Sequence, residues 1–169
     1  GSGISKRNKR RMKKIVTPKA LPTLITQLKL EEKSIVLVGG VFDIIHPGHI
    51  HFLNQSKAHG DLLFFLLESD KSVEKLKGKD RPIFNQNQRA NVIEALSSVS
   101  FIVKLDSVLF DSDYYKLTEI IKPDIIAATK GDSIRNKKID QAQKINAQFL
   151  EIDNIENHSS TDIIKRLGL

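Results

Sequence analysis

Ile35-Val36-Leu37-Val38-Gly39-Gly40-Val41-Phe42-Asp43-Ile44-Ile45-His46-Pro47-Gly48-His49 is the stretch that decides the fold of this chain. The apolar run 35–38 is typical of a short buried strand. The glycine pair after it predicts a turn, and apolar residues at helical spacing begin at Ile50. Glycines let the backbone approach an anion, and a helix N-terminus favours negative charge. We therefore expect a phosphate site at this turn.

His46 and His49 are the main catalytic candidates. They stand three residues apart at the start of an expected helix, 48–58, so both rings can reach the same space. There they can donate hydrogen bonds to bound phosphates. Asp43 can orient a histidine or a metal ion, or cap the turn. The remaining candidates for contact with the nucleotide at this turn are Gly39, Gly40, Val41, Phe42 and Gly48.

Strands and helices alternate along the rest of the chain. Further strands are predicted at 62–67, 101–105, 124–128 and 149–152, and further helices at 21–28, from Asn85 onward, and at 113–121, 137–146 and 160–167. Asn85 and Gln88 have capping-box spacing. This alternation predicts an α/β fold of the Rossmann-like, doubly wound type, with a parallel sheet of about five strands and helices on both faces. The strand 35–38 is then central, and a ligand binds at the switch point beside it.

Three further segments carry candidate residues. The segment 69–85 is predicted to be a lysine-rich loop, and its Lys77 and Lys79 can fold over phosphates or remain solvated. Gly131 and Asp132 follow the strand 124–128, as an ordinary turn or as part of a nucleoside pocket. Ser159, Ser160 and Thr161 begin the last helix, where hydroxyls can cap free N–H groups or hold phosphates.

The stretch 39–49 resembles the His-x-Gly-His signature of the cytidylyltransferase-like nucleotidyltransferases, Gly-(Thr/Val/Cys)-Phe-Asp-x-x-His-x-Gly-His. Lys77-Gly78-Lys79-Asp80-Arg81-Pro82 is similar to Lys-Gly-x-x-Arg-Pro of the heptose 1-phosphate adenylyltransferases in that family. The hydroxyl segment 159–161 and the turn 129–132 also resemble family elements, the turn being one residue shorter. The resemblance implies that Lys77 or Lys79 contacts the phosphates. It also implies that Arg89 holds the nucleotide or orients the loop.

The activity that the resemblance implies is transfer of a nucleoside monophosphate to a phosphorylated small molecule, with release of pyrophosphate. Mg2+ would bind with the nucleotide, largely through water, and no protein metal ligands are expected. ATP and a sugar 1-phosphate are favoured. The alternatives are a CTP-dependent glycerol-3-phosphate cytidylyltransferase and a flavin mononucleotide (FMN) adenylyltransferase, and, in another class, a non-catalytic nucleotide-binding module. The chain departs from the heptose group at Gly39-Gly40, where Asn-Gly is usual, and at the unusual segment 66–70.

Charge and composition limit the kinds of partner that we expect for this chain. Among the 169 residues, seven basic side chains between Lys6 and Lys14 account for the whole net charge of +7. The body, 14–169, is therefore a nearly neutral single domain, and nucleic acid is not an expected partner. Residues 1–13 are expected to be a disordered arm, whose Gly1-Ser2-Gly3 resembles the remnant of an expression tag. There is no cysteine, no signal-peptide pattern and no apolar run that could span a bilayer, so we expect a cytoplasmic protein without a membrane partner. A homodimer remains an open alternative.

Overall fold

The computed structural model describes residues 13–155 and 159–169. Within them, six parallel strands form one sheet in the order β1-β4-β3-β2-β5-β6. The strands are β1 (Ile15–Val16), β2 (Ile35–Gly40), β3 (Leu62–Leu67), β4 (Phe101–Lys104), β5 (Ile125–Thr129) and β6 (Gln148–Ile152). The predicted parallel α/β fold is confirmed, and the strand predicted at 35–38 lies inside the sheet as β2. The sheet has one more strand than expected. The extra strand, β1, has two residues, too few to show a period in the sequence.

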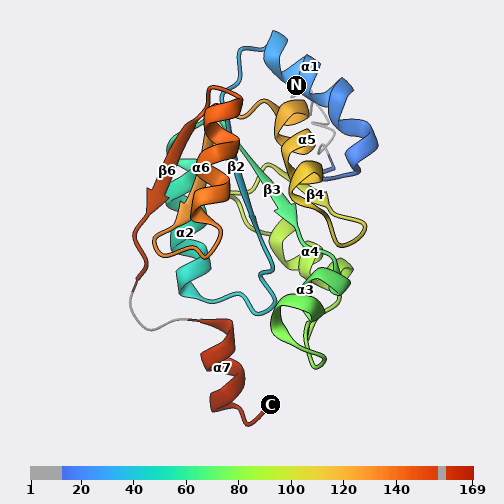
Figure 1. Cartoon of the computed structure of the whole chain (residues 1–169), viewed down its shortest axis with the longest axis vertical. Helices are drawn as coiled ribbons and strands as arrows, with labels where there is room; N and C mark the ends of the chain where they lie inside the picture. Colours follow the sequence, from blue (N-terminus) through green and yellow to red (C-terminus); the bar gives the residue numbers. More distant parts are fainter. Residues whose placement is uncertain (1–12, 156–158) are drawn as a thin grey trace, which may run out of the picture.

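Helices cover both faces of the sheet (Figure 1). One face carries α1 (Leu21–Leu30), α5 (Asp111–Ile121) and α6 (Arg135–Lys144), and the other carries α2 (Pro47–Lys57) and α4 (Gln86–Glu94). A short 3-10 turn, Pro18–Ala20, leads into α1. Along the strands, side chains alternate between the two cores: Leu37 faces one and Val36 the other. Burial on both faces explains the near-continuous apolar runs in the sequence.

Two local predictions are wrong. The segment 69–85 is not all loop, because α3 (Asp70–Lys77) occupies its first half. Ser69 begins this helix, its hydroxyl accepting from the N–H of Ser72 at 3.2 Å, and the buried Val73 anchors it. The predicted turn at Gly39-Gly40 is the end of β2 instead, since both glycines pair with β3. The turn begins two residues later at Phe42, which has a left-handed backbone with φ 44°.

Lys14, at the expected start of the body, links two elements of the fold. The ammonium of Lys14 donates to the carbonyls of Glu94 and Leu96, each at 3.0 Å, and so joins β1 to the end of α4. The predicted arm, 1–13, lies outside the described residues except for Lys13. In the part of the chain that is described, no helix has the length and apolar character needed to cross a bilayer.

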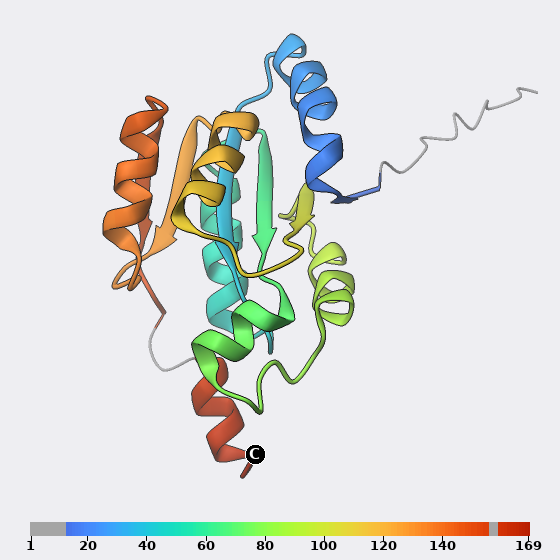
Figure 2. The ribbon, with the colours of Figure 1, turned by 45° about the vertical axis from the view of Figure 1, so that its right-hand side comes forward.

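The sheet has a switch point next to β2. From β2 the chain moves outward through β3 and β4, then returns to β5 on the other side of β2. The carboxyl ends of β2 and β5 therefore diverge into loops that leave in opposite directions. Figure 2 shows α3 and α7 (Ser160–Arg166) gathered at this end of the sheet. Elements far apart in the sequence thus meet around one opening.

Candidate active site

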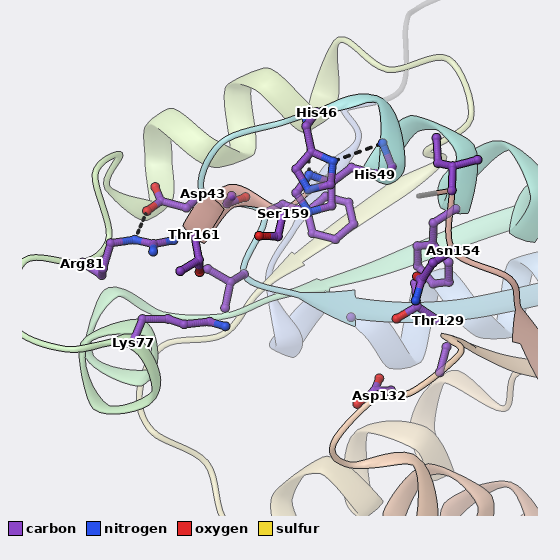
Figure 3. Close-up of a pocket in the computed structure, with 18 of the residues that line it drawn as sticks. Asp43, His46, His49, Lys77, Arg81, Thr129, Asp132, Asn154, Ser159 and Thr161 are labelled. Atoms are coloured by element: carbon purple, nitrogen blue, oxygen red, sulfur yellow. Dashed lines mark hydrogen bonds and ion pairs between the residues drawn. The ribbon is translucent and has the colours of Figure 1, made fainter. Parts of the chain in front are cut away.

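A cavity of about 340 Å³ opens at the switch point (Figure 3). Its walls come from the end of β2, the start of α2, the end of α3, the end of β5 and the start of α7. Most of the predicted site residues line it: Gly39, Val41, Phe42, Asp43, His46, Gly48, His49, Lys77, Asp132, Ser159, Ser160 and Thr161. Four predicted site residues do not line it: Gly40, Lys79, Arg89 and Gly131.

The two histidines form part of a column of stacked rings. His46 stacks on His49 with ring centroids 3.7 Å apart, and His49 stacks on Phe42 at 3.9 Å. The N–H of Gly48 donates to Nδ1 of His46 at 3.1 Å, and the N–H of His46 donates to Nδ1 of His49 at 3.4 Å. In neutral His46, the proton therefore sits on Nε2, which makes Nε2 a hydrogen-bond donor.

His49 is held in its neutral form. Burial, and to a lesser extent the neighbouring His46, together lower its pKa from 6.5 to about 3, against an opposing hydrogen bond to the backbone of Ile44. At neutral pH the ring therefore carries no charge. Donation from this ring to a phosphate would be that of a neutral imidazole, and an approaching phosphate would raise its affinity for a proton.

Phe42 forms the end of the ring column, and Gly40 leaves space for its ring. A side chain at Gly40 would place its Cβ 3.1 Å from the ring of Phe42, which also packs edge-on against Phe65 at 4.7 Å. Glycine at position 40 therefore leaves room for the ring under His49. Gly40 therefore contributes to the site, although it does not line the cavity that the histidines line.

Asp43 ties the turn after β2 to the segment after α3. Its carboxylate, with no exposed side-chain surface, accepts from Nε of Arg81 at 2.8 Å. It also accepts from the N–H groups of Ile83 at 2.8 Å and Phe84 at 2.9 Å. Both carboxylate oxygens are thus engaged, so Asp43 orients a loop and not a histidine or a metal ion. Arg81 also lines the cavity, although its place in the Arg-Pro motif did not by itself predict a site residue.

Arg89 lies behind the cavity and not in it. The residue is 1% exposed, and its guanidinium donates to the carbonyls of Val41, Glu68 and Phe84 at 2.8 to 3.0 Å. It also pairs with the carboxylate of Asp70 at 2.8 Å. Of the two roles considered for it, orientation of the loop fits these contacts, and direct contact with a nucleotide does not.

The start of α7 closes another wall of the cavity. The hydroxyl of Ser159 caps the helix by accepting from the N–H of Asp162 at 3.0 Å. The hydroxyl of Ser160 donates to the carbonyl of Ile44 at 2.8 Å and so fixes α7 to the turn before α2. Two of the three predicted hydroxyl residues therefore have structural contacts as well as a place at the cavity. Thr161 lines the cavity beside them.

The charged residues that were predicted for the site differ in whether they line the cavity. Lys77, the last residue of α3, lines the cavity, whereas Lys79 is exposed beyond it. Asp132 lines the cavity and pairs with Lys138 at 2.7 Å, while Gly131 beside it supplies a left-handed turn with φ 80°. Other lining residues lie outside the set of predicted site residues: Phe52, Ala128, Thr129, Lys138, Asn154 and Ile155. Of these, Thr129 belongs to the turn 129–132, whose resemblance to a family element is a signal that could have found it.

No cluster of three or more acidic or histidine side chains suited to a metal ion occurs in 13–155 or 159–169. The two carboxylates at the cavity, Asp43 and Asp132, already have cationic partners. A divalent cation at this site would therefore depend on oxygen ligands brought by the nucleotide and on water.

A cavity at the switch point of a parallel sheet, beside a helix N-terminus, is where this architecture binds nucleotide phosphates. The domain is thus of the Rossmann-like nucleotide-binding class. It belongs to the cytidylyltransferase-like family, whose model matches residues 37–166. The family and the relatives below indicate a nucleotidyltransferase enzyme.

The curated relatives include the "Bifunctional protein HldE" of Aliarcobacter butzleri, 34% identical over 90% of this chain and 31% of its own length. The protein of the same name from Campylobacter jejuni subsp. doylei is 39% identical over 88% of this chain and 31% of its own length. The chain therefore spans about a third of the length of these relatives.

Two solved structures are similar. The lipopolysaccharide core biosynthesis protein from Thermoplasma volcanium has a TM-score of 0.61 and 31% identity, over 73% of this chain and 99% of that one. Pantoate-beta-alanine ligase from Francisella tularensis, complexed with beta-gamma ATP and beta-alanine, has a TM-score of 0.57. At 15% identity, over 88% of this chain and 74% of that one, it shows a shared fold.

Proposed function

We propose that the domain transfers a nucleoside monophosphate, with AMP from ATP favoured, to the phosphate of a small phosphorylated acceptor and releases pyrophosphate. The observation that carries the proposal is the convergence of His46, His49, Lys77 and the start of α7 on one cavity at the switch point. An acceptor phosphate oxygen would attack the α-phosphorus, a new P–O bond would form, and the bond to the β-phosphate oxygen would break. No covalent enzyme intermediate is needed.

The side chains at the cavity suit this chemistry. His46 can donate from Nε2 to a phosphate oxygen, because its Nδ1 already accepts from the Gly48 N–H. His49 can contribute a neutral ring beside it. Lys77, which lines the cavity from the end of α3, can offset the charge that develops on the leaving pyrophosphate. Donors aimed at developing charge are the main source of rate enhancement in reactions of this kind.

Mg2+ bound with the nucleotide would neutralise phosphate charge and hold the phosphates in line. The residues present fit such an ion if the phosphates and water supply its ligands, since Asp43 and Asp132 are engaged elsewhere. The chain's own part would be to hold the nucleotide from the other side, through the histidines, Lys77 and the N–H groups at the starts of α2 and α7.

Pyrophosphate release tests the activity. The protein would be mixed with each of the four nucleoside triphosphates, Mg2+ and a panel of acceptors that includes glucose 1-phosphate, glycerol 3-phosphate and FMN. Pyrophosphate release that depends on an acceptor is expected. Tight nucleotide binding without release under any pairing would instead support a non-catalytic binding module.

The choice of base is a separate prediction. The resemblance to the heptose and flavin adenylyltransferases favours ATP over CTP. A pocket that recognises a base by hydrogen bonds rejects the wrong base strongly, because buried polar groups would be left unpaired. Calorimetric titration with ATP and with CTP, both with Mg2+, should therefore show ATP binding at least about tenfold tighter. Tighter binding of CTP would overturn the adenylyltransferase assignment and leave the nucleotidyltransferase assignment intact.

A further inference from the structure

A second, larger cavity of about 710 Å³ adjoins the first. It lies between the end of β2, α3, the start of α5 and α6. Five residues line both cavities: Gly39, Val41, Lys77, Asp132 and Lys138. If the first cavity takes the nucleotide, a molecule in the second would meet the nucleotide phosphates at this shared boundary. Group transfer requires such contact between the reacting atoms.

Glu68, the residue after β3, has an unused hydrogen-bond acceptor at this cavity. Its Oε1 accepts from the hydroxyl of Tyr114 at 2.6 Å. Its Oε2 is buried and has no hydrogen-bond partner among residues 13–155 and 159–169. A buried carboxylate oxygen without a donor costs free energy, because it has lost water and gained nothing in exchange. A ligand that supplies a donor would remove this cost.

Tyr114 cannot also donate a hydrogen bond to Oε2 of Glu68. Its one hydroxyl proton is committed to Oε1, and burial together with the hydrogen bond to Glu68 raises the pKa of Tyr114, so it stays protonated. The missing donor at Oε2 must therefore come from outside the pair. Hydroxyl groups are the donors that suit a carboxylate without adding charge to the site.

Positive charge lies on the helices that border the same cavity. Lys75 and Lys77 line it from α3, and neither has an ion-pair partner within the described part of the chain. Lys137 and Lys138 line it from α6 and pair with Asp111 and Asp132. Since Lys77 also lines the nucleotide cavity, a phosphate at the shared boundary would have a cationic neighbour.

The mouth of the second cavity is apolar. Leu76, Val108, Phe110 and Ile134 line it, and all four are exposed, Phe110 at 78%. Side chains of this kind can cover the carbon skeleton of a small ligand and keep water from the reacting phosphates. The cavity thus combines a phosphate-compatible boundary, a buried acceptor for hydroxyls and an apolar cover.

We propose that the second cavity is the acceptor subsite and that Glu68, braced by Tyr114, selects an acceptor phosphate that carries several hydroxyl groups. One such hydroxyl donates to Oε2 of Glu68 while the acceptor phosphate lies at the boundary near Lys77. This inference rests on the proposed function, because it takes the first cavity as the nucleotide site. Glu68 falls in the segment 66–70, where the chain departs from the heptose group, so its effect on selectivity belongs to this chain's own sequence.

Binding tests the subsite without requiring turnover. With a non-hydrolysable ATP analogue and Mg2+ present, calorimetry would compare three polyol phosphates (glucose 1-phosphate, ribitol 5-phosphate and glycerol 3-phosphate) with cyclohexyl phosphate. Cyclohexyl phosphate has a six-membered ring and a phosphate but no ring hydroxyls. At least one polyol phosphate should bind about tenfold tighter or more, the effect of one hydrogen bond to a charged group. Equal or tighter binding of cyclohexyl phosphate, or no binding of any polyol phosphate, would overturn the proposal.

Two variants locate the effect at the pair. Glu68→Gln keeps an oxygen for Tyr114 and replaces Oε2 by an N–H2 group, and Tyr114→Phe removes the brace. Both should reduce the preference for the polyol phosphate about tenfold and leave the affinity for the ATP analogue unchanged. The matched controls are Glu119→Gln and Tyr115→Phe, both on α5, the helix that carries Tyr114, and both outside the two cavities. An unchanged preference in both Glu68→Gln and Tyr114→Phe would refute the role of the pair.

Turnover separates this inference from the proposed function. If the wild-type protein releases pyrophosphate with an acceptor, Glu68→Gln should raise the acceptor KM with little change in kcat. Unchanged KM would reject the acceptor role of Glu68 alone. Selective polyol phosphate binding that Glu68→Gln abolishes, without pyrophosphate release for any nucleotide, would reject the proposed function and keep the subsite.

Discussion

His46 and His49 reach their positions through contacts within their own turn. The N–H of Gly48 fixes one ring and the N–H of His46 fixes the other, so the helix start orients both. The spacing of the two residues predicted that they share a space. It could not predict that Phe42, with its left-handed backbone, would supply the third ring of the stack. That contact depends on a turn whose geometry the sequence does not reveal.

Replacement of either histidine by alanine should reduce turnover about 10²- to 10³-fold, the usual loss when one donor to a developing charge is removed. The measurement is acceptor-dependent pyrophosphate release, with circular dichroism to check the fold. The control is His59→Ala, which changes an exposed histidine just after the same helix. This variant should keep normal turnover and a normal circular dichroism spectrum. Near-normal turnover in His46→Ala or His49→Ala would make that histidine structural.

The neutral state of His49 predicts a pH dependence of stability. Its pKa is about 3 in the fold and 6.5 when unperturbed, so between these values the unfolded chain binds the proton and the fold does not. Its contribution to stability is therefore complete above pH 6.5 and is lost as the pH falls toward 3. From pH 7.5 to pH 5, wild type should lose up to about 2 kcal/mol more than His49→Asn in urea unfolding. Parallel losses in the two proteins would contradict a buried neutral ring.

At the scale of elements, two arginines fasten the turn after β2 to distant segments. Arg81 reaches Asp43 from the segment after α3, and Arg89 reaches the backbone of Val41 from α4. The sequence showed that these arginines stand near a phosphate-binding loop. It did not separate an arginine that contacts a ligand from one that holds a backbone, because that difference depends on burial. The helix α3 was not predicted either, because two apolar residues, Val73 and Leu76, are too few to show a helical period in the sequence.

Asp43→Asn should lower the free energy of unfolding by about 3 kcal/mol or more, since it leaves the guanidinium of Arg81 without its buried partner. Urea unfolding measures the loss. Asp153→Asn is the control: the pair Lys130–Asp153 is exposed at 69% and 86%, and its loss should cost no more than about 1 kcal/mol. A similar small loss for both variants would show that the Asp43–Arg81 pair does not stabilise the loop.

At the scale of the whole molecule, the sequence predicted the architecture well because an alternation of apolar strands and amphipathic helices leaves few topologies. The parallel sheet, its central β2 and the position of the cavity all follow from that order. The edge strand β1 and the second cavity were not predicted. Both depend on how elements approach one another after folding, and no local pattern records that approach.

The basic arm gives a prediction for the complete chain. Deletion of residues 1–13 removes most of the basic residues in the run from Lys6 to Lys14 and keeps Lys14, which joins β1 to α4. Nucleotide turnover should be unchanged, and any salt-sensitive binding of nucleic acid should disappear. Fluorescence anisotropy with a labelled oligonucleotide at low and high salt checks the second point. Binding that persists in the truncated protein would reveal a basic surface on the folded body.

The contact between Ser160 and Ile44 joins residues 116 positions apart, at a wall of the cavity that the histidines line. During synthesis, the ribosome therefore delivers the histidine pair long before it delivers the residues that complete the wall. A nascent chain that stops short of Ser159 can contain the whole sheet and both histidines, yet it lacks part of the pocket. If this cavity takes the nucleotide as proposed, a nascent chain without α7 would offer the nucleotide only part of its contacts, so ligand stabilisation would be withheld until α7 has been made.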